Sequence, residues 1–163
     1  MRKLFLIGLA LALVLCGCGA KETLETIADD IPVESVLGQM REISVRLPDG
    51  AVSPVLKSEA EQLYLSEDYE ILVQTCPAGN LNDTIRKLTG FDKEQLTVME
   101  TEQDGAKRYD FVWAAAGEDG ERLGRAAILD DGSYHYCLSV LRDAQGEKSQ
   151  VVWSEVFSSF GLV

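Results

Sequence analysis

The sequence predicts an α+β protein built on an antiparallel sheet of about six to seven strands, with helices packed against the sheet. Segments with strand-like alternation of apolar and polar residues occupy most of the chain between residues 43 and 142. Asp-Gly pairs separate the later segments, and such turns favour tight hairpins and therefore antiparallel pairing. Two other segments carry apolar residues at helical spacing. These observations together predict a hairpin-rich sheet covered by two helices.

The first strands precede the first helix. Alternation over residues 43–47 predicts a strand that stops at the turn signal Pro48-Asp49-Gly50. Residues 62–66 and 69–76 predict two further strands, joined tightly around Glu67-Asp68.

The helix that follows has marked ends. Asn80 can accept hydrogen bonds from the free amides of the first turn, and Asp83 suits the positive end of the helix dipole. Gly90 supplies a left-handed cap, after which Phe91 folds back onto the helix. The apolar face comprises Leu81, Ile85 and Leu88.

A meander of four strands comes next, at 96–103, 106–116, 121–130 and 133–142. Both faces of these strands carry apolar residues, so we expect cover on both sides of the sheet. A last helix has its aromatic stripe at positions i, i+3, i+4 and i+7, and Gly161 is expected to end it. The stripe comprises Trp153, Val156, Phe157 and Phe160.

This order of elements resembles the Mog1/PsbP fold, an antiparallel sheet between helices. The chain also resembles uncharacterised secreted lipoproteins of gut-type anaerobic bacteria, through the segments 84–90, 107–113, 127–132 and 153–160. The resemblance covers roughly residues 40 to 163, and its motifs are structural rather than catalytic. It implies a role in binding or assembly without naming a ligand.

The chain begins with Arg2 and Lys3, followed by an apolar run from Leu4 to Leu15 that is shorter than the roughly 20 residues of a membrane-spanning helix. The motif Leu15-Cys16-Gly17-Cys18 resembles a bacterial lipobox. This resemblance implies a signal peptide at residues 1–17 and a lipid on Cys18. We therefore expect a lipid-anchored protein of the cell envelope, on the outer face of the cytoplasmic membrane or on the outer membrane.

Residues 18–38 are polar and weakly patterned, which predicts a lipidated tether before a single domain at 39–163. The whole chain has a net charge of −12, and loss of Arg2 and Lys3 would take it to −14. This acidity argues against nucleic acid as a partner, because phosphate binding uses clustered Lys and Arg. We expect contact with the membrane only through the lipid, and a protein partner in the envelope.

Two cysteines remain in the domain, Cys76 and Cys137, both in predicted strands. Outside the cytoplasm they can form one disulfide. They can equally remain reduced as small apolar core residues, since a domain of this size does not need a disulfide. The sequence leaves both alternatives open.

No catalytic residue and no cofactor or metal site is predicted. The only histidine, His135, lies in a strand, where a structural role outweighs a zinc site with Cys76 and Cys137, or a thiol nucleophile with His135 as base. The run Asp130-Asp131-Gly132 is interpreted as a hairpin turn rather than a calcium loop. Gly117, Gly120 and Gly124 have the spacing of turn residues rather than of a phosphate loop.

Aromatic residues at strand spacing suggest either a core or a binding groove. If they line a groove, tyrosines with polar tips are the better surface candidates, and two arginines can meet an anionic group. The groove candidates are Tyr109, Trp113, Tyr134, Tyr136, Arg108 and Arg125.

Three classes of function remain. The first, which we favour from sequence, is a non-enzymatic protein-binding or assembly module. The second is a small-ligand or lipid-binding lipoprotein, which requires an apolar pocket beneath the sheet or beside the last helix. The third is a hydrolase, which requires a cleft that brings His135 near a carboxylate or thiol.

Overall fold

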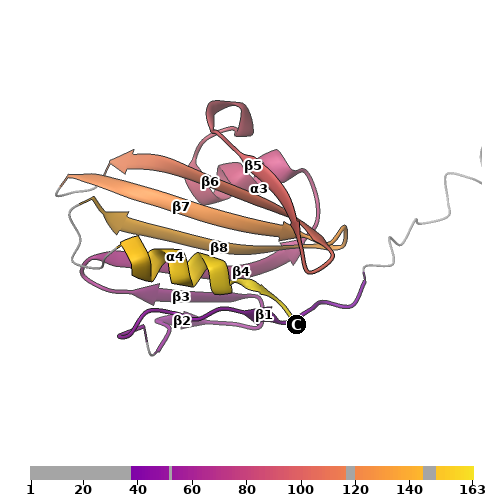
Figure 1. The fold of residues 1–163 in the computed structure, drawn as a ribbon, viewed down its shortest axis with the longest axis horizontal. Helices are drawn as coiled ribbons and strands as arrows, with labels where there is room; N and C mark the ends of the chain where they lie inside the picture. The colour runs from indigo at the N-terminus through magenta and orange to yellow at the C-terminus, as the bar shows by residue number, and fades with distance from the viewer. Residues whose placement is uncertain (1–37, 52, 117–119, 145–149) are drawn as a thin grey trace, which may run out of the picture. The chain divides into compact units, whose positions relative to one another are not determined.

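The computed structural model describes residues 38–51, 53–116, 120–144 and 150–163. Its centre is a seven-stranded sheet in the order β2-β3-β4-β8-β7-β6-β5, in which every neighbouring pair is antiparallel (Figure 1). The predicted α+β class with an antiparallel sheet is thereby confirmed. The strands are β2 (Leu56–Lys57), β3 (Glu61–Leu65), β4 (Tyr69–Pro77), β5 (Met99–Gln103), β6 (Ala106–Ala116), β7 (Glu121–Asp130) and β8 (Tyr134–Asp143).

Strands β4 and β8 join the two halves of the sheet. Their register runs from Tyr69 opposite Arg142 to Pro77 opposite Tyr134, and it places Cys76 opposite His135. The meander β5 to β8 follows the predicted hairpins. Gly124, which spacing alone grouped with turn residues, instead lies within β7 opposite Trp113 of β6.

Helix α3 (Leu81–Thr89) has the predicted ends. Asn80 accepts a hydrogen bond from the backbone N–H of Asn82 at 2.9 Å, and Gly90 adopts a φ of 83° with its N–H donated to the carbonyl of Arg86. The 3-10 helix η1 (Lys93–Gln95) follows and delays β5, which was expected from residue 96, to Met99.

Helix α4 (Gln150–Ser159) ends two residues before Gly161, which begins the short strand β9 (Gly161–Leu162). Strand β9 pairs antiparallel with β1 (Ile43–Ser44), so the expected strand at 43–47 is shorter than its alternation suggests and stands outside the main sheet. The backbone N–H of Leu162 also donates to Asp104 Oδ2 at 3.3 Å. The helix therefore ends early because residues 161 and 162 form hydrogen bonds with segments that are distant in the sequence.

The two helices cover opposite faces of the sheet, as Figure 1 shows. Trp153, Val156 and Phe157 of α4 pack on the face formed by alternate residues of β4, β7 and β8. Ile85 of α3 packs on the other face with Phe111. The prediction of cover on both faces is confirmed.

All fully buried hydrophobic residues of the described chain lie between Tyr69 and Leu162. This part of the protein thus holds its own hydrophobic core, as an independently folding domain does. No helix among the described residues has the length and apolar character needed to cross a membrane. The predicted signal peptide, Cys18 and the predicted tether up to residue 37 lie outside the described residues.

Candidate functional site

The face of the sheet that α3 covers brings together the thiol and imidazole side chains, the most reactive groups of the described chain. Because Cys76 pairs with His135 and Gln74 with Cys137, both thiols and the imidazole project from the same face of β4 and β8. Thr84 of α3 lies over them, and its Oγ1 shares a hydrogen bond of 2.8 Å with His135 Nδ1. The register therefore places the Cys76 thiol and the His135 imidazole on directly opposite residues of neighbouring strands, a juxtaposition that the sequence could not establish.

His135 is held as a neutral, buried side chain. It is 1% exposed, and burial lowers the pKa of its imidazole despite the nearby carboxylates of Asp130 and Asp131. Its Nε2 lies 3.7 Å from Asp130 Oδ2 and has no hydrogen-bond partner among the described residues. An imidazole in this state has no open path to a substrate.

Both cysteines are free thiols in this structure, Cys76 half-buried and Cys137 buried. A hydrogen bond from Cys137, with help from Lys87 and Thr84, lowers the pKa of Cys76 to about 6 in spite of burial. The same hydrogen bond, together with burial, raises the pKa of Cys137. The hydrogen bond thus favours the thiolate of Cys76 and the protonated thiol of Cys137, and both alternatives of a disulfide and of two reduced thiols stay open for the exported protein.

No group of three or more His, Cys, Asp or Glu residues in the described part of the chain is arranged to hold a metal ion. The carboxylates of Asp130 and Asp131 accept hydrogen bonds that stabilise the turn between β7 and β8. Asp131 accepts hydrogen bonds from the backbone N–H of Tyr134 at 2.7 Å and from the hydroxyl of Tyr136 at 2.8 Å, and Asp130 accepts one from Gly132 at 2.8 Å.

The six groove candidates do not share one surface. Tyr109 and Trp113 are buried on the α3 face. Tyr134 and Tyr136 lie on the α4 face, where the Tyr136 hydroxyl accepts a hydrogen bond from the backbone N–H of Arg41 at 2.9 Å. The Tyr136 hydroxyl therefore holds the segment before β1 to the sheet rather than lining a groove.

Arg108 also has a structural role, because its side chain forms hydrogen bonds within the domain. Its guanidinium forms a paired contact with Asp110 at 2.6 and 2.9 Å, and donates to Gln103 and to the carbonyls of Phe157 and Phe160 near the end of α4. The residue is 8% exposed. These partners occupy the donors that a ligand would need.

A pocket beside α4, here called the α4 pocket, has a volume of about 520 Å³. It lies between α4 and the ends of β6, β7 and β8, and it includes Trp113 and Arg125 from the predicted groove set. Its lining consists of Val112, Trp113, Ala114, Leu123, Gly124, Arg125, Val140, Arg142, Gln150, Trp153 and Phe157. Apolar side chains dominate, and the two arginines are its only charged residues among those the structure describes.

Arg142 was missed by sequence reasoning. The signal was available, because Tyr134, Tyr136, Leu138 and Val140 share one face of β8 and Arg142 is the next residue in that series. Its place in a pocket also depends on the packing of α4 against the sheet, which the alternation within β8 does not indicate.

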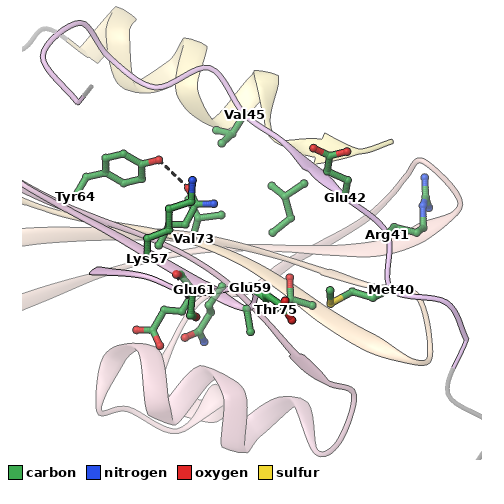
Figure 2. A pocket seen from close by; sticks show the side chains of 15 residues that line it. Met40, Arg41, Glu42, Val45, Lys57, Glu59, Glu61, Tyr64, Val73 and Thr75 are labelled. Atoms are coloured by element: carbon green, nitrogen blue, oxygen red, sulfur yellow. Dashed lines mark hydrogen bonds between the residues drawn. The ribbon is translucent and has the colours of Figure 1, made fainter. Parts of the chain in front are cut away.

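A second pocket of about 420 Å³, the β1 pocket, lies where the segment containing β1 crosses strands β3 and β4. Figure 2 shows Arg41, Glu42 and Val45 on the crossing segment, and Lys57 and Glu61 on the other side. Its charges are of mixed sign, and Arg41 is held by the carbonyls of Asp104 and Leu162 at 2.8 and 3.2 Å. This pocket offers a smaller apolar surface than the α4 pocket.

Neither a protein-family model nor a curated protein matches this chain.

Proposed function

We propose that the protein is a non-enzymatic binding protein of the cell envelope, anchored by lipid on Cys18, that takes a small apolar ligand in the α4 pocket. The α4 pocket carries this proposal, because its volume of about 520 Å³ and its apolar lining are typical of small-molecule sites. It occupies the place beside the last helix that the ligand-binding class requires.

The state of His135 supports binding rather than hydrolysis. Its imidazole is enclosed beneath α3 and engaged by Thr84, whereas a general base must reach the proton that it removes. The α4 pocket lies on the opposite face of the sheet from this residue.

The observed order of strands and helices supports our assignment of the domain as Mog1/PsbP-like.

The anchoring part of the proposal rests on the lipobox resemblance. Two or three acyl chains give stable attachment where one chain is marginal. Metabolic labelling of the full chain with a fatty acid tests this part. We expect Cys18→Ser to abolish the label and membrane retention and Cys16→Ser to preserve both; label that survives Cys18→Ser would overturn the assignment.

A protein partner is the second candidate. Three exposed apolar side chains lie on the same face of neighbouring strands, two of them at the rim of the α4 pocket: Val112 is 62% exposed, Leu123 36% and Met99, outside the pocket, 60%. An exposed apolar strip of this kind is typical of contact surfaces. It favours the α4 face over the α3 face for a protein contact.

Native mass spectrometry of residues 20–163, purified from the natural host and recombinantly, tests ligand binding. We expect an extra small mass on the protein from its host. Ala114→Phe, which fills the α4 pocket from an exposed position, should remove that mass. Ala116→Phe is the matched control, because Ala116 is exposed on the same strand and does not line the pocket. A bound mass unaffected by Ala114→Phe would place the ligand elsewhere.

A further inference from the structure

The α4 pocket contains two arginines whose positive charges are poorly neutralised by the described residues. Arg125 of β7 pairs with Val140 of β8, and Leu123 pairs with Arg142. The two arginines are thus diagonal neighbours on one face of adjacent strands, within reach of a common group for side chains of this length.

Arg125 is the more constrained of the two. Its Cζ lies 4.1 Å from the centroid of the Phe157 ring, and its Nη2 is 4.0 Å from Asp110 Oδ1. That carboxylate already makes the paired contact with Arg108 at 2.6 and 2.9 Å. Among the described residues the Arg125 guanidinium makes no hydrogen bond that would compete with a ligand.

Arg142 has an even weaker set of partners. Its Nη1 donates to the carbonyl of Asp143 at 3.5 Å, and within the described chain no carboxylate lies within 4.0 Å of it. Arg122, one strand away, shows the contrast, since it contacts Glu70 at 2.6 Å and Asp143 at 3.3 Å. Among the described residues, neither arginine of the α4 pocket has a carboxylate as close as the partners of Arg122, although the chain carries 27 Asp and Glu against 15 Lys and Arg.

The surroundings favour an anion over water at these guanidinium groups. Leu123, Trp153 and Phe157 form apolar walls, and electrostatic attraction is stronger beside low-dielectric walls than in bulk solvent. Burial lowers the pKa of Arg125, and the opposing effect of Asp110 does not offset it. The hydrogen bonds of a bound anion would compensate for the part of its hydration that the guanidinium has lost.

We infer that the α4 pocket binds a free amphiphilic carboxylate, with its carboxylate at Arg125 and Arg142 and its apolar chain against Leu123, Trp153 and Phe157. This inference rests on the proposed function and adds the chemistry of the ligand. Arginine forms paired hydrogen bonds with carboxylates, and the apolar walls supply area for a hydrocarbon chain.

The chain offers an internal probe of this site. It contains two tryptophans: Trp153 lines the α4 pocket from α4, whereas the indole of Trp113 packs on the α3 face of the sheet. Binding there should change the intrinsic fluorescence without any added label. The soluble fragment 20–163 is suitable because it holds the entire described core.

Fluorescence titrations with decanoate, decanol and decyltrimethylammonium, each below its micelle concentration, separate charge from hydrophobicity. We expect decanoate to bind more tightly than decanol by about tenfold or more, as a charge-assisted hydrogen bond implies, and the cation to bind most weakly. The preference for decanoate should shrink in high salt.

Arginine variants assign the preference to the pocket. Arg125→Gln and Arg142→Gln should each reduce decanoate affinity by several fold and leave decanol affinity unchanged, which also shows that the variants remain folded. Arg86→Gln is the matched control, because Arg86 is exposed on α3 at the opposite face. It should retain the full preference.

The outcomes separate the two proposals. Equal binding of decanoate and decanol, or a preference that survives the double variant Arg125→Gln/Arg142→Gln, would overturn the carboxylate inference and leave the ligand-binding function standing. Failure of all three probes to bind would overturn the proposed function.

Discussion

The indole of Trp113 lies directly over the backbone of Gly124, its register partner on the neighbouring strand. A Cβ atom placed on Gly124 would meet Trp113 Cε2 at 2.0 Å, which is closer than atoms can approach without movement. Trp113 also belongs to the core beneath α3, where it packs with Phe111. The glycine therefore makes room for the ring, and no turn is involved.

Gly124→Ala should destabilise the domain. The indole must leave its position or the strands must separate, and such overpacking costs about 1 to 3 kcal/mol. Urea unfolding followed by circular dichroism measures the change. Gly79→Ala is the control, since nothing lies within 4 Å of the added atom there. Equal stability of Gly124→Ala and the parent chain would contradict this account of the contact.

Arg108→Met should lower the free energy of unfolding by about 3 to 5 kcal/mol, because it leaves the carboxylate of Asp110, whose side chain is only 13% exposed, without its main partner. The carbonyls of Phe157 and Phe160 lose a donor at the same time. Denaturant titration checks the loss. The double variant Arg108→Met/Asp110→Leu should recover part of the stability, since it removes the orphaned charge. A double variant as unstable as the single one would show that the carbonyl contacts dominate.

Stability should fall as the pH drops below about 6.5. Burial lowers the pKa of His135 in the folded protein, so the unfolded chain binds a proton more readily and acid favours unfolding. The stabilisation is complete above the ordinary histidine pKa and is lost as the pH falls below it. Because His135 is the only histidine, its NMR signals give the folded pKa directly. Unfolding measured against pH should flatten in His135→Gln, and an unchanged slope would assign the effect to carboxylates.

Cys76 should react with iodoacetamide near neutral pH, and faster than Cys137. Its pKa is lowered to about 6, chiefly by the hydrogen bond from Cys137, while Cys137 is buried with a raised pKa. Rates read by mass spectrometry across pH 5 to 9 check this order. Cys137→Ala removes the donor and should move the rate profile of Cys76 to higher pH. An unchanged profile would rule out that hydrogen bond as the cause.

The alternative of a disulfide between these two cysteines has its own measurement. Intact mass after alkylation, with and without prior reduction, distinguishes two free thiols from one bond in protein exported by the natural host. Free thiols after export would establish the reduced core that the structure shows.

Local chemistry made much of the fold predictable. Asn80 and Gly90 mark the ends of α3 because capping uses only neighbouring backbone groups, and the Asp-Gly turns between later strands bound the hairpins for the same reason. The end of α4 was less predictable. Strand β9 replaces the expected last turn because β1 and Asp104, both far away in the chain, supply its partners.

The candidate site divides in the same way. Arg125 lies in the α4 pocket on the strand face that its spacing indicates, but Trp113 is buried under α3. The carbonyls of Phe157 and Phe160 hold Arg108, and the backbone of Arg41 holds Tyr136. A sequence pattern shows which face of a strand a side chain occupies. It does not show which residue, distant in the sequence, forms a hydrogen bond with the polar group of that side chain.

The sequence alone determines the α+β class, most strand and helix positions, and the acidic charge, because these features depend on residue type and local periodicity. Only the tertiary structure decided the order of the strands, the pairing of β4 with β8, and the meeting of Arg125 and Arg142 beside α4. Those features arise from contacts between segments far apart in the chain. Their energies depend on burial and on competing partners, which no local pattern records.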